Sequence, residues 1–284
     1  MPIDYAALKA FDIPEVRQRV SANDVMLYAL SIGLGQDPMD AAQLDYVTEK
    51  RLRAMPAMAN VLGYAGFWLA DPRTGVDAVK LVHGEQSMTI HATLPTEGMV
   101  IGKTRVTEII DKGAGKGALL YSSRDIHDAG GKLLATIDGT TFLRADGGFG
   151  GPSGPVKAPH PLPDRAPDAV LDLATRPEQA LLYRLNGDMN PLHSDPELAA
   201  RAGFPQPILH GLCSFGVIAH ALLKSLCAYD AEKFGRMDLR FTAPVFPGET
   251  IRTEIFHEPG GAAFRARVVE RDIIVANNGM FRFR

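Results

Sequence analysis

Residues Gly211–Tyr229 read "GLCSFGVIAHALLKSLCAY" and form the longest apolar run of the sequence that is compatible with one helix. Apolar residues recur on almost every side of a helix drawn through it: Leu212, Phe215, Ile218, Leu222, Leu223 and Leu226. A helix of that kind has to be covered by other elements over most of its surface. Because Lys224 and His220 interrupt the apolar run, we expect a buried core helix rather than a membrane span.

The segments around this helix have the pattern of β-strands. Phe264, Ala266 and Val268 alternate with Arg265 and Arg267, as in a half-buried strand. Glycine- and proline-containing turns separate seven such segments, at 102–112, 117–128, 132–145, 235–245, 248–258, 262–272 and 273–284. The order of helices and strands predicts an α+β fold in which a curved antiparallel sheet wraps round the buried helix.

The chain shows signs of an internal duplication. The stretch "MLYALSIG", which contains Tyr28, resembles "LLYRLNGD", which contains Tyr183, 155 residues later. Similarly, "LVHGEQ" with His83 resembles "ILHGLC" with His210, 127 residues later. If both pairs are equivalent, the first copy holds 28 more residues between these landmarks than the second copy.

A glycine- and proline-rich segment separates the two copies. It reads "GGFGGPSGPVKAPHPLPDRAPDA" from position 147. No Gly-Lys-Ser/Thr follows the glycines, so a linker is a better interpretation than a phosphate-binding loop. We therefore predict a first repeat at 1–146, a linker at 147–166 and a second repeat at 167–284.

The composition excludes several classes of protein. The 284 residues are 46% hydrophobic and 22% charged, which is typical of a globular protein with a substantial core. The net charge is −3 and no run of Lys or Arg is present, which argues against a nucleic-acid partner. We recognise no targeting signal, so we expect a cytoplasmic (bacterial) protein. No Cys/His cluster has the spacing of a metal site.

The stretch "NGDMNPLHSDPEL", which begins at Asn186, carries the candidate chemistry. Gly187 and Pro191 each disfavour helix, so Asp188 and His193 are expected on a loop between two helices. A loop can turn both side chains toward one point. The pair can serve catalysis, or it can simply cap and pack. In the first copy Gly33 stands in place of Asp188 and no histidine follows, which favours a function for the pair.

The sequence around this loop resembles a known family. "YRLNGDMNPLHSDPELAARAGFPQPILHGLCSFG" is similar to the signature of the MaoC-like dehydratases and the (R)-specific type-2 enoyl-CoA hydratases. The first half resembles the degenerate N-terminal half of the two-repeat, eukaryotic-type hydratase 2. The resemblance implies a double hotdog fold, a homodimer, and reversible hydration of trans-2-enoyl-CoA to (R)-3-hydroxyacyl-CoA without a cofactor.

The resemblance also implies roles for single residues. Asp188 and His193 would hold and activate a water molecule between them. Asn190 would support the site by hydrogen bonding, although an Asn before Pro is equally typical of a turn. Gly211 would donate its backbone N–H to the thioester oxygen, since the first N–H groups of a helix lack partners within it. His210 would line the pocket or pack at the start of the helix.

By resemblance, the first half shapes the pocket for the acyl chain. Met55, Phe67 and Trp68 are candidates for its lining, although ordinary core packing explains such residues equally well. The scattered Lys and Arg residues give no basis for choosing the contacts of the CoA phosphates.

Three alternative functions remain open at this stage. The chain can act as a 3-hydroxyacyl-thioester dehydratase on another carrier, as a thioesterase, or as a non-catalytic acyl-CoA-binding or assembly protein. The Asn190–His193 string argues against a thioesterase, and an intact Asp188–His193 pair argues against a non-catalytic role. In each case the expected partner is an acyl thioester, with no nucleic acid and no membrane.

Overall fold

The computed structural model describes residues 3–284 of the chain. Its helices are α1 Tyr5–Lys9, α2 Ala22–Ser31, α3 Ala41–Val47, α4 Gln179–Tyr183, α5 Pro196–Arg201 and α6 Gly211–Cys227. The 3-10 turns are η1 Glu49–Arg51, η2 Pro56–Asn60, η3 Trp68–Ala70, η4 Pro72–Thr74, η5 Arg184–Asn186, η6 Pro191–His193 and η7 Ala231–Lys233. The strands are β1 Val16–Val20, β2 Leu81–Ile90, β3 Gly98–Asp111, β4 Ala118–Asp128, β5 Leu133–Leu143, β6 Ala169–Ala174, β7 Phe234–Phe241, β8 Thr250–Glu258, β9 Gly261–Val268 and β10 Ile273–Phe283.

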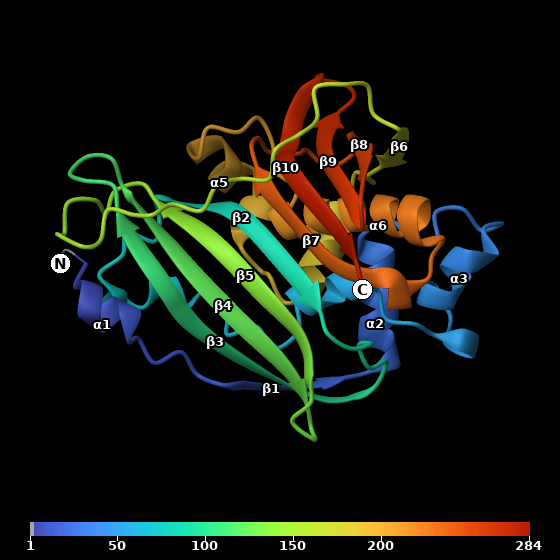
Figure 1. Ribbon diagram of the computed structural model, residues 1–284, viewed down its shortest axis with the longest axis horizontal. Coiled ribbons are helices and arrows are strands. Elements are labelled where there is room, and N and C mark those ends of the chain that lie inside the picture. Colours follow the sequence, from blue (N-terminus) through green and yellow to red (C-terminus); the bar gives the residue numbers. More distant parts are fainter. Residues whose placement is uncertain (1–2) are drawn as a thin grey trace.

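All of these strands form one antiparallel sheet (Figure 1). Their order is β1-β3-β4-β5-β2-β7-β10-β9-β8-β6. The second five strands therefore repeat the order of the first five in reverse, with β2 corresponding to β7. These two strands pair at the centre, where Ser87 lies opposite Asp238. The symmetry of the sheet confirms the predicted α+β double hotdog fold and its internal duplication.

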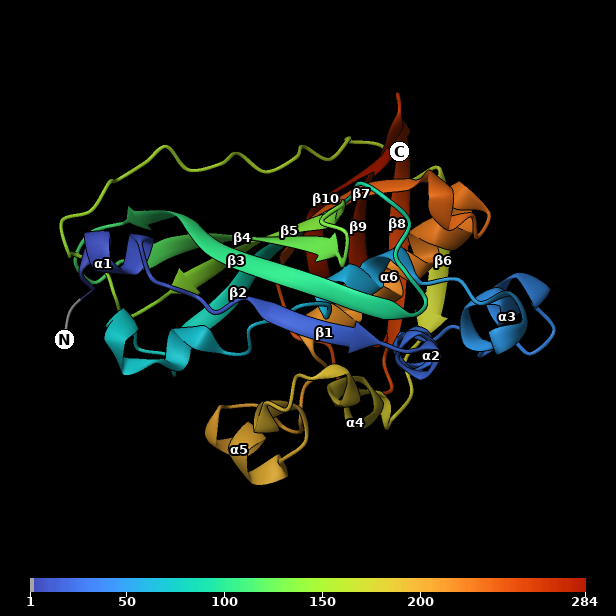
Figure 2. The same cartoon turned by 90° about the horizontal axis from the view of Figure 1, so that it is seen from below.

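The connection between the halves is long because the strands it joins are far apart in the sheet. Strand β5 ends at Leu143, and β6 begins at Ala169 on the far edge of the second half. The predicted boundaries at 146 and 167 fall between these two strands. Figure 2 shows the linker running along one side of the sheet, with α4 and α5 on the opposite side.

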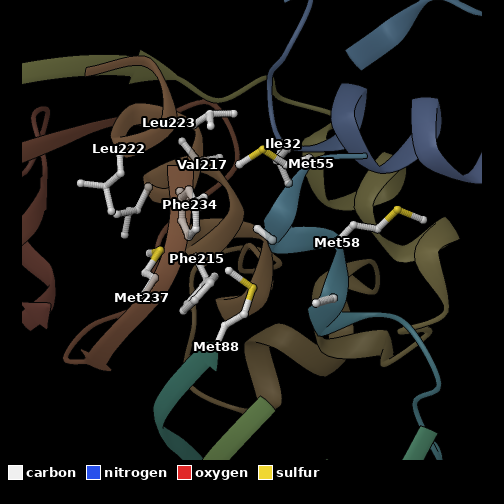
Figure 3. Packing of buried hydrophobic residues seen from close by; sticks show 14 of the residues in the cluster. Ile32, Met55, Met58, Met88, Phe215, Val217, Leu222, Leu223, Phe234 and Met237 are labelled. Carbon is white, nitrogen blue, oxygen red and sulfur yellow. The ribbon is translucent and has the colours of Figure 1, made fainter. Parts of the chain in front are cut away.

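Helix α6 is the buried helix expected from the sequence. It packs against β6, β7 and β8 of its own half and against η2 of the first half. Gly216 allows α2 to approach closely, since an added Cβ would lie 2.4 Å from Cγ2 of Ile32. Figure 3 shows side chains of both halves, such as Met55 and Phe215, in one shared core. Within residues 3–284, no helix is long and apolar enough to cross a membrane.

One part of the proposed repeat alignment is wrong. His83 lies within strand β2, whereas His210 is the N-cap residue of α6, so the two histidines are not equivalent. From Tyr28 to the start of β2 at Leu81 there are 53 residues (81 − 28), and from Tyr183 to the start of β7 at Phe234 there are 51 (234 − 183). The first copy therefore has no 28-residue excess. It differs instead by having short turns where the second copy has α6.

Candidate active site

The candidate site lies on the loop between α4 and α5, as the sequence predicts. Helix α4 continues into η5, which ends at Gly187 with φ +112°. Such a left-handed conformation favours glycine and turns the chain sharply. Pro191 then opens η6, and Asp195 caps α5 by accepting from the N–H groups of Glu197 and Leu198. The loop is thus fixed at both ends by local sequence.

This loop brings the predicted pair together and adds a third group. Polar side-chain atoms of Asp188, His193 and His210 all lie within 4.8 Å of one another. His193 and His210 are buried, and Asp188 is half-buried. The third group belongs to the residue before α6, so the start of that helix faces the loop.

A backbone contact sets the orientation of His193. Its Nδ1 lies 2.8 Å from the carbonyl oxygen of Ile208, which can only accept, so Nδ1 carries the hydrogen. In the neutral ring Nε2 is then left with a free lone pair. Burial lowers the pKa of His193, against the opposing effects of the Ile208 carbonyl and of Asp188. His193 is therefore a proton acceptor near neutral pH.

His210 is held beside it as a second neutral imidazole. Its Nε2 donates to the backbone carbonyl of Asp188 over 3.2 Å, and its ring stacks on His193 at a centroid distance of 3.7 Å. Burial, and then the neighbouring His193, lower the pKa of His210 to about 4. Nδ1 of His210 is buried and has no hydrogen-bond partner among the described residues. His210 thus lines the site and fixes the backbone of Asp188.

The three side chains are poorly arranged to chelate a metal ion. The two imidazole rings are stacked, with 27° between their planes. Ring lone pairs lie in the ring plane, so those of stacked rings do not converge on one point as a metal site requires. The geometry suits a polar ligand or water better than a chelated cation.

Asn190 has a structural role in the loop. Its Oδ1 accepts from the N–H of Leu192 over 3.0 Å, and its own backbone N–H donates to Oδ1 of Asp188 over 3.2 Å. Its side chain therefore starts η6, as an Asn before Pro often does. The additional role of the amide in catalysis stays a prediction.

Gly211 lies at the start of α6, where backbone N–H groups lack partners within the helix. It is the first residue of α6, and within the described chain no side chain caps this helix. Its φ is outside the left-handed region, and an added Cβ would make only an ordinary 3.5 Å contact with Phe241. Folding therefore does not explain a glycine here. A glycine at this place leaves the N-terminus of α6 open to close approach.

Comparison with known proteins identifies the family. The model of the MaoC like domain matches residues 159–278, and that of the MFE-2 hydratase 2 N-terminal domain matches residues 19–145. The chain is 38% identical to the enoyl-CoA hydratase ChsH3 of Mycobacterium tuberculosis over 99% of this chain and 98% of that protein. The chain belongs to the MaoC-like hydratase 2 family.

Other members of this family resemble the chain over most of its length. It is 42% identical to 3-hydroxyacyl-thioester dehydratase Y of Mycobacterium tuberculosis, over 88% of this chain and 86% of that one. The structure of full-length peroxisomal multifunctional enzyme type 2 from Drosophila melanogaster superposes with a TM-score of 0.83 at 32% identity. That match covers 95% of this chain and 48% of the fly enzyme, so this chain spans about half the length of that protein.

In this MaoC-like hydratase, the residues predicted to line an acyl pocket do not lie together. Met55 is fully buried in the shared core. Trp68 stacks on Phe11 in a separate hydrophobic cluster, and Phe67 is 53% exposed. A hollow of about 240 Å³ adjoins the loop that carries Asp188. Its lining mixes apolar Leu27, Met58, Val61 and Leu185 with polar Gln18, Asp24 and Asn186.

Several residues of the first half approach the site of this hydratase, and sequence reasoning missed them. Burial lowers the pKa of His83, whose ring lies 5.0 Å from that of Phe241. Burial, and then the charge of Asp188, raise the pKa of Tyr64. These residues are more than 100 positions from Asp188 in the sequence. The pairing of β2 with β7 and the packing of α2 and η2 bring the two halves together here.

Proposed function

We propose that this enzyme hydrates trans-2-enoyl-CoA reversibly to (R)-3-hydroxyacyl-CoA at the site formed by Asp188, His193 and Gly211. The observation that carries the proposal is the convergence of an acid and a neutral imidazole in front of the N-terminus of α6. Relatives over nearly the full chain are named enoyl-CoA hydratase and 3-hydroxyacyl-thioester dehydratase, which supports a hydro-lyase.

The reaction requires one water molecule, a group that accepts a proton from it, and a group that delivers a proton to C2. The water oxygen bonds to C3 of the enoyl group, one O–H bond breaks, and a proton adds to C2 as the double bond is lost. Nε2 of His193 is free to accept from the water, and the carboxylate of Asp188 can hold its second hydrogen. The two groups are close enough to titrate together, so we assign the proton transfers to the pair.

The negative charge of the intermediate develops on the thioester oxygen. The N–H of Gly211, at the positive end of the α6 dipole, is the donor we propose for it. One such donor typically contributes about 3 kcal/mol to transition-state stability. Water, two side chains and one backbone N–H supply every group that the reaction needs, so the proposal includes no cofactor.

The test is the loss of enoyl-thioester absorbance with crotonyl-CoA and a decenoyl-CoA. We expect Asp188→Asn and His193→Gln each to lower turnover by at least about 100-fold while the protein stays folded. His91→Gln is a matched control, because His91 is exposed and bonds only Thr136 through its ring. Turnover near that of the wild type in either site variant would remove the pair from the mechanism.

A second candidate is dehydration of a 3-hydroxyacyl group on another carrier. It is favoured by the 42% identity to 3-hydroxyacyl-thioester dehydratase Y. Hydration and dehydration share one transition state, so the same residues serve both directions. Comparing kcat/KM for one acyl group on CoA and on acyl carrier protein decides between the carriers. The homodimer and the cytoplasmic location stay predictions.

A further inference from the structure

Ser31, the last residue of α2, connects the first half to the catalytic loop of the second half. It is fully buried. Its hydroxyl donates to the carbonyl of Tyr28 over 2.7 Å and accepts from Nδ2 of Asn186 over 2.9 Å. Its carbonyl accepts from Nε2 of Gln179 over 2.6 Å and from Sγ of Cys213 over 3.4 Å. One residue thus contacts α4, η5 and α6.

The contact with Asn186 matters because of where Asn186 lies. It precedes Asp188 by two residues, and Gly187 between them has the left-handed φ of +112°. The Asn186 amide also donates to the carbonyl of Tyr183 over 2.9 Å. Both N–H groups of this amide are therefore hydrogen-bonded. One donates to the Tyr183 carbonyl at the end of α4, and the other donates to the Ser31 hydroxyl. This amide therefore ties the end of η5, from which the chain continues to Asp188, to both α4 and Ser31.

We infer that Ser31 is a positioning residue for Asp188, acting through Asn186. The inference rests on the proposed role of Asp188 as part of the water-activating pair. Misplacing a reacting group by about 1 Å can cost about 100-fold in rate. Ser31 is fully buried, so removing its hydroxyl takes away the buried partner of the Asn186 amide. By this route the first half, which lacks an acid–histidine pair, contributes to the chemistry of the second.

The experiment compares Ser31→Ala, Asn186→Ala and the double variant with the wild type. We expect each single variant to lower kcat for crotonyl-CoA by about 10- to 100-fold, with KM changed less than about 2-fold, because the bond orients a reacting group. The double variant should be no slower than the slower single variant, because both changes remove one shared interaction. If the factors by which kcat falls in the two single variants multiply in the double variant, the inference is overturned.

A second substrate separates positioning of Asp188 from shaping of the acyl pocket. Leu27 of α2 lines the hollow beside the loop, so a disturbed α2 can also affect acyl binding. Loss of a positioning contact should lower kcat by the same factor for crotonyl-CoA and decenoyl-CoA. A loss confined to decenoyl-CoA, or seen mainly in KM, overturns the inference.

Tyr46→Phe is the matched control. Tyr46 donates its hydroxyl to the carbonyl of Tyr229 over 2.6 Å, which is another buried hydrogen bond between the two halves. Tyr229 follows the C-terminus of α6, at the opposite end of the helix from Gly211. We expect this variant to keep the kcat of the wild type. An equal loss of kcat in Tyr46→Phe shows a general effect of loosened halves and overturns the inference.

The activities of the wild type and of the variants distinguish a failure of the inference from a failure of the proposed function. If the folded wild type hydrates neither substrate, the proposed function fails and the positioning role fails with it. If the wild type is active and Ser31→Ala and Asn186→Ala are equally active, only the positioning role fails. Because Asn186 is only half-buried, its variant tests the contact even where Ser31→Ala is too unstable to purify.

Discussion

The chemistry at the residue scale depends on imidazoles that stay neutral. Burial lowers the pKa of His193, and it lowers the pKa of His210 to about 4. A protonated His193 has no lone pair to accept a proton from water. The neighbouring His193 also lowers the pKa of His210, whose ring stacks on it at 3.7 Å, so the two rings are not charged together. The arrangement keeps the acceptor ready at neutral pH.

This arrangement predicts how the rate depends on pH. As pH falls, kcat/KM for crotonyl-CoA should decline with a midpoint below about 6.5, the usual pKa of a histidine. The direction follows from burial, which makes His193 protonate at lower pH than a free imidazole. Steady-state rates between about pH 4.5 and 8 provide the measurement. A decline of kcat/KM with its midpoint above about pH 6.5 would contradict the role of His193 as the proton acceptor.

The same shifts affect stability, which the rate measurement has to take into account. The folded pKa values of His210 and His220 are lowered by burial to about 4, below the value in the unfolded chain. Between about pH 6.5 and 4 the unfolded state therefore binds more protons, and stability falls as pH falls. The effect is about 1.4 kcal/mol per pH unit for each such group. Circular dichroism at each pH identifies the range in which the enzyme is still folded.

Sequence predicted the pair at this scale but not its surroundings. Asp188 and His193 were predicted because Gly187 and Pro191 place them on a loop, because the first copy lacks the pair, and because the stretch resembles a family signature. Ser31, Tyr64 and His83 lie more than 100 positions earlier, and no local pattern relates them to the loop. Their contacts arise from the packing of α2 and from the pairing of β2 with β7. Such contacts are tertiary and leave no periodic signal in the sequence.

At the scale of elements, the end of α2 packs closely against α6 at Gly216. An added Cβ at Gly216 would lie 2.4 Å from Cγ2 of Ile32 and 3.2 Å from the Tyr28 hydroxyl. Ile32 is β-branched and buried, so it cannot turn away easily. This contact also holds Ser31 against Cys213 of α6. Gly216 therefore leaves room for the end of α2 beside α6.

Gly216→Ala should lower the free energy of unfolding by about 1 kcal/mol or more. Overpacking of a dense core typically costs about 1–3 kcal/mol, which exceeds the gain of up to about 1 kcal/mol from replacing glycine in a helix. Urea denaturation provides the measurement. Ser225→Ala, on the exposed side of α6, gains helix propensity without a clash and should not be destabilised. Unchanged stability of Gly216→Ala would show that α2 is free to move away.

Periodicity predicted most of the strands and helix α6 correctly and failed where the pattern is broken. Strands β3, β4, β5 and β7–β10 coincide closely with the segments expected from alternation and turns. Strand β2 was missed because its register shifts between His83 and Glu85, which interrupts the alternation. The edge strands β1 and β6 are short, with five and six residues, and were missed as well. Helix α6 was predicted because its apolar residues surround it.

At the scale of the whole molecule, the two halves share one sheet and one hydrophobic core. Strand β7 pairs with β2 on one side and with β10 on the other. The core cluster around α6 includes residues of the first half such as Tyr28, Ile32 and Met55. Neither half buries its apolar surface alone.

A fragment of residues 159–284 should therefore not behave as an active monomer. It would expose one edge of β7 and the surface of α6 that the first half covers, which favours self-association. It would also lack Ser31, so we expect turnover at least about 100-fold below that of the full chain. Size-exclusion chromatography and the crotonyl-CoA assay provide the measurements. A folded, fully active monomer would contradict the dependence on the first half.

The linker, unlike the contacts between the halves, is not needed to hold the two halves together once they have folded. Residues 152–159 are exposed and run outside the shared sheet. A protease cut there would leave two polypeptides that still hold each other through β2, β7 and the common core. The covalent joint thus serves mainly to keep the two partners at equal amounts and high effective concentration. When the two pieces are produced from separate genes, they should associate into a heterodimer. Hydration turnover that appears only when both pieces are present would show this association.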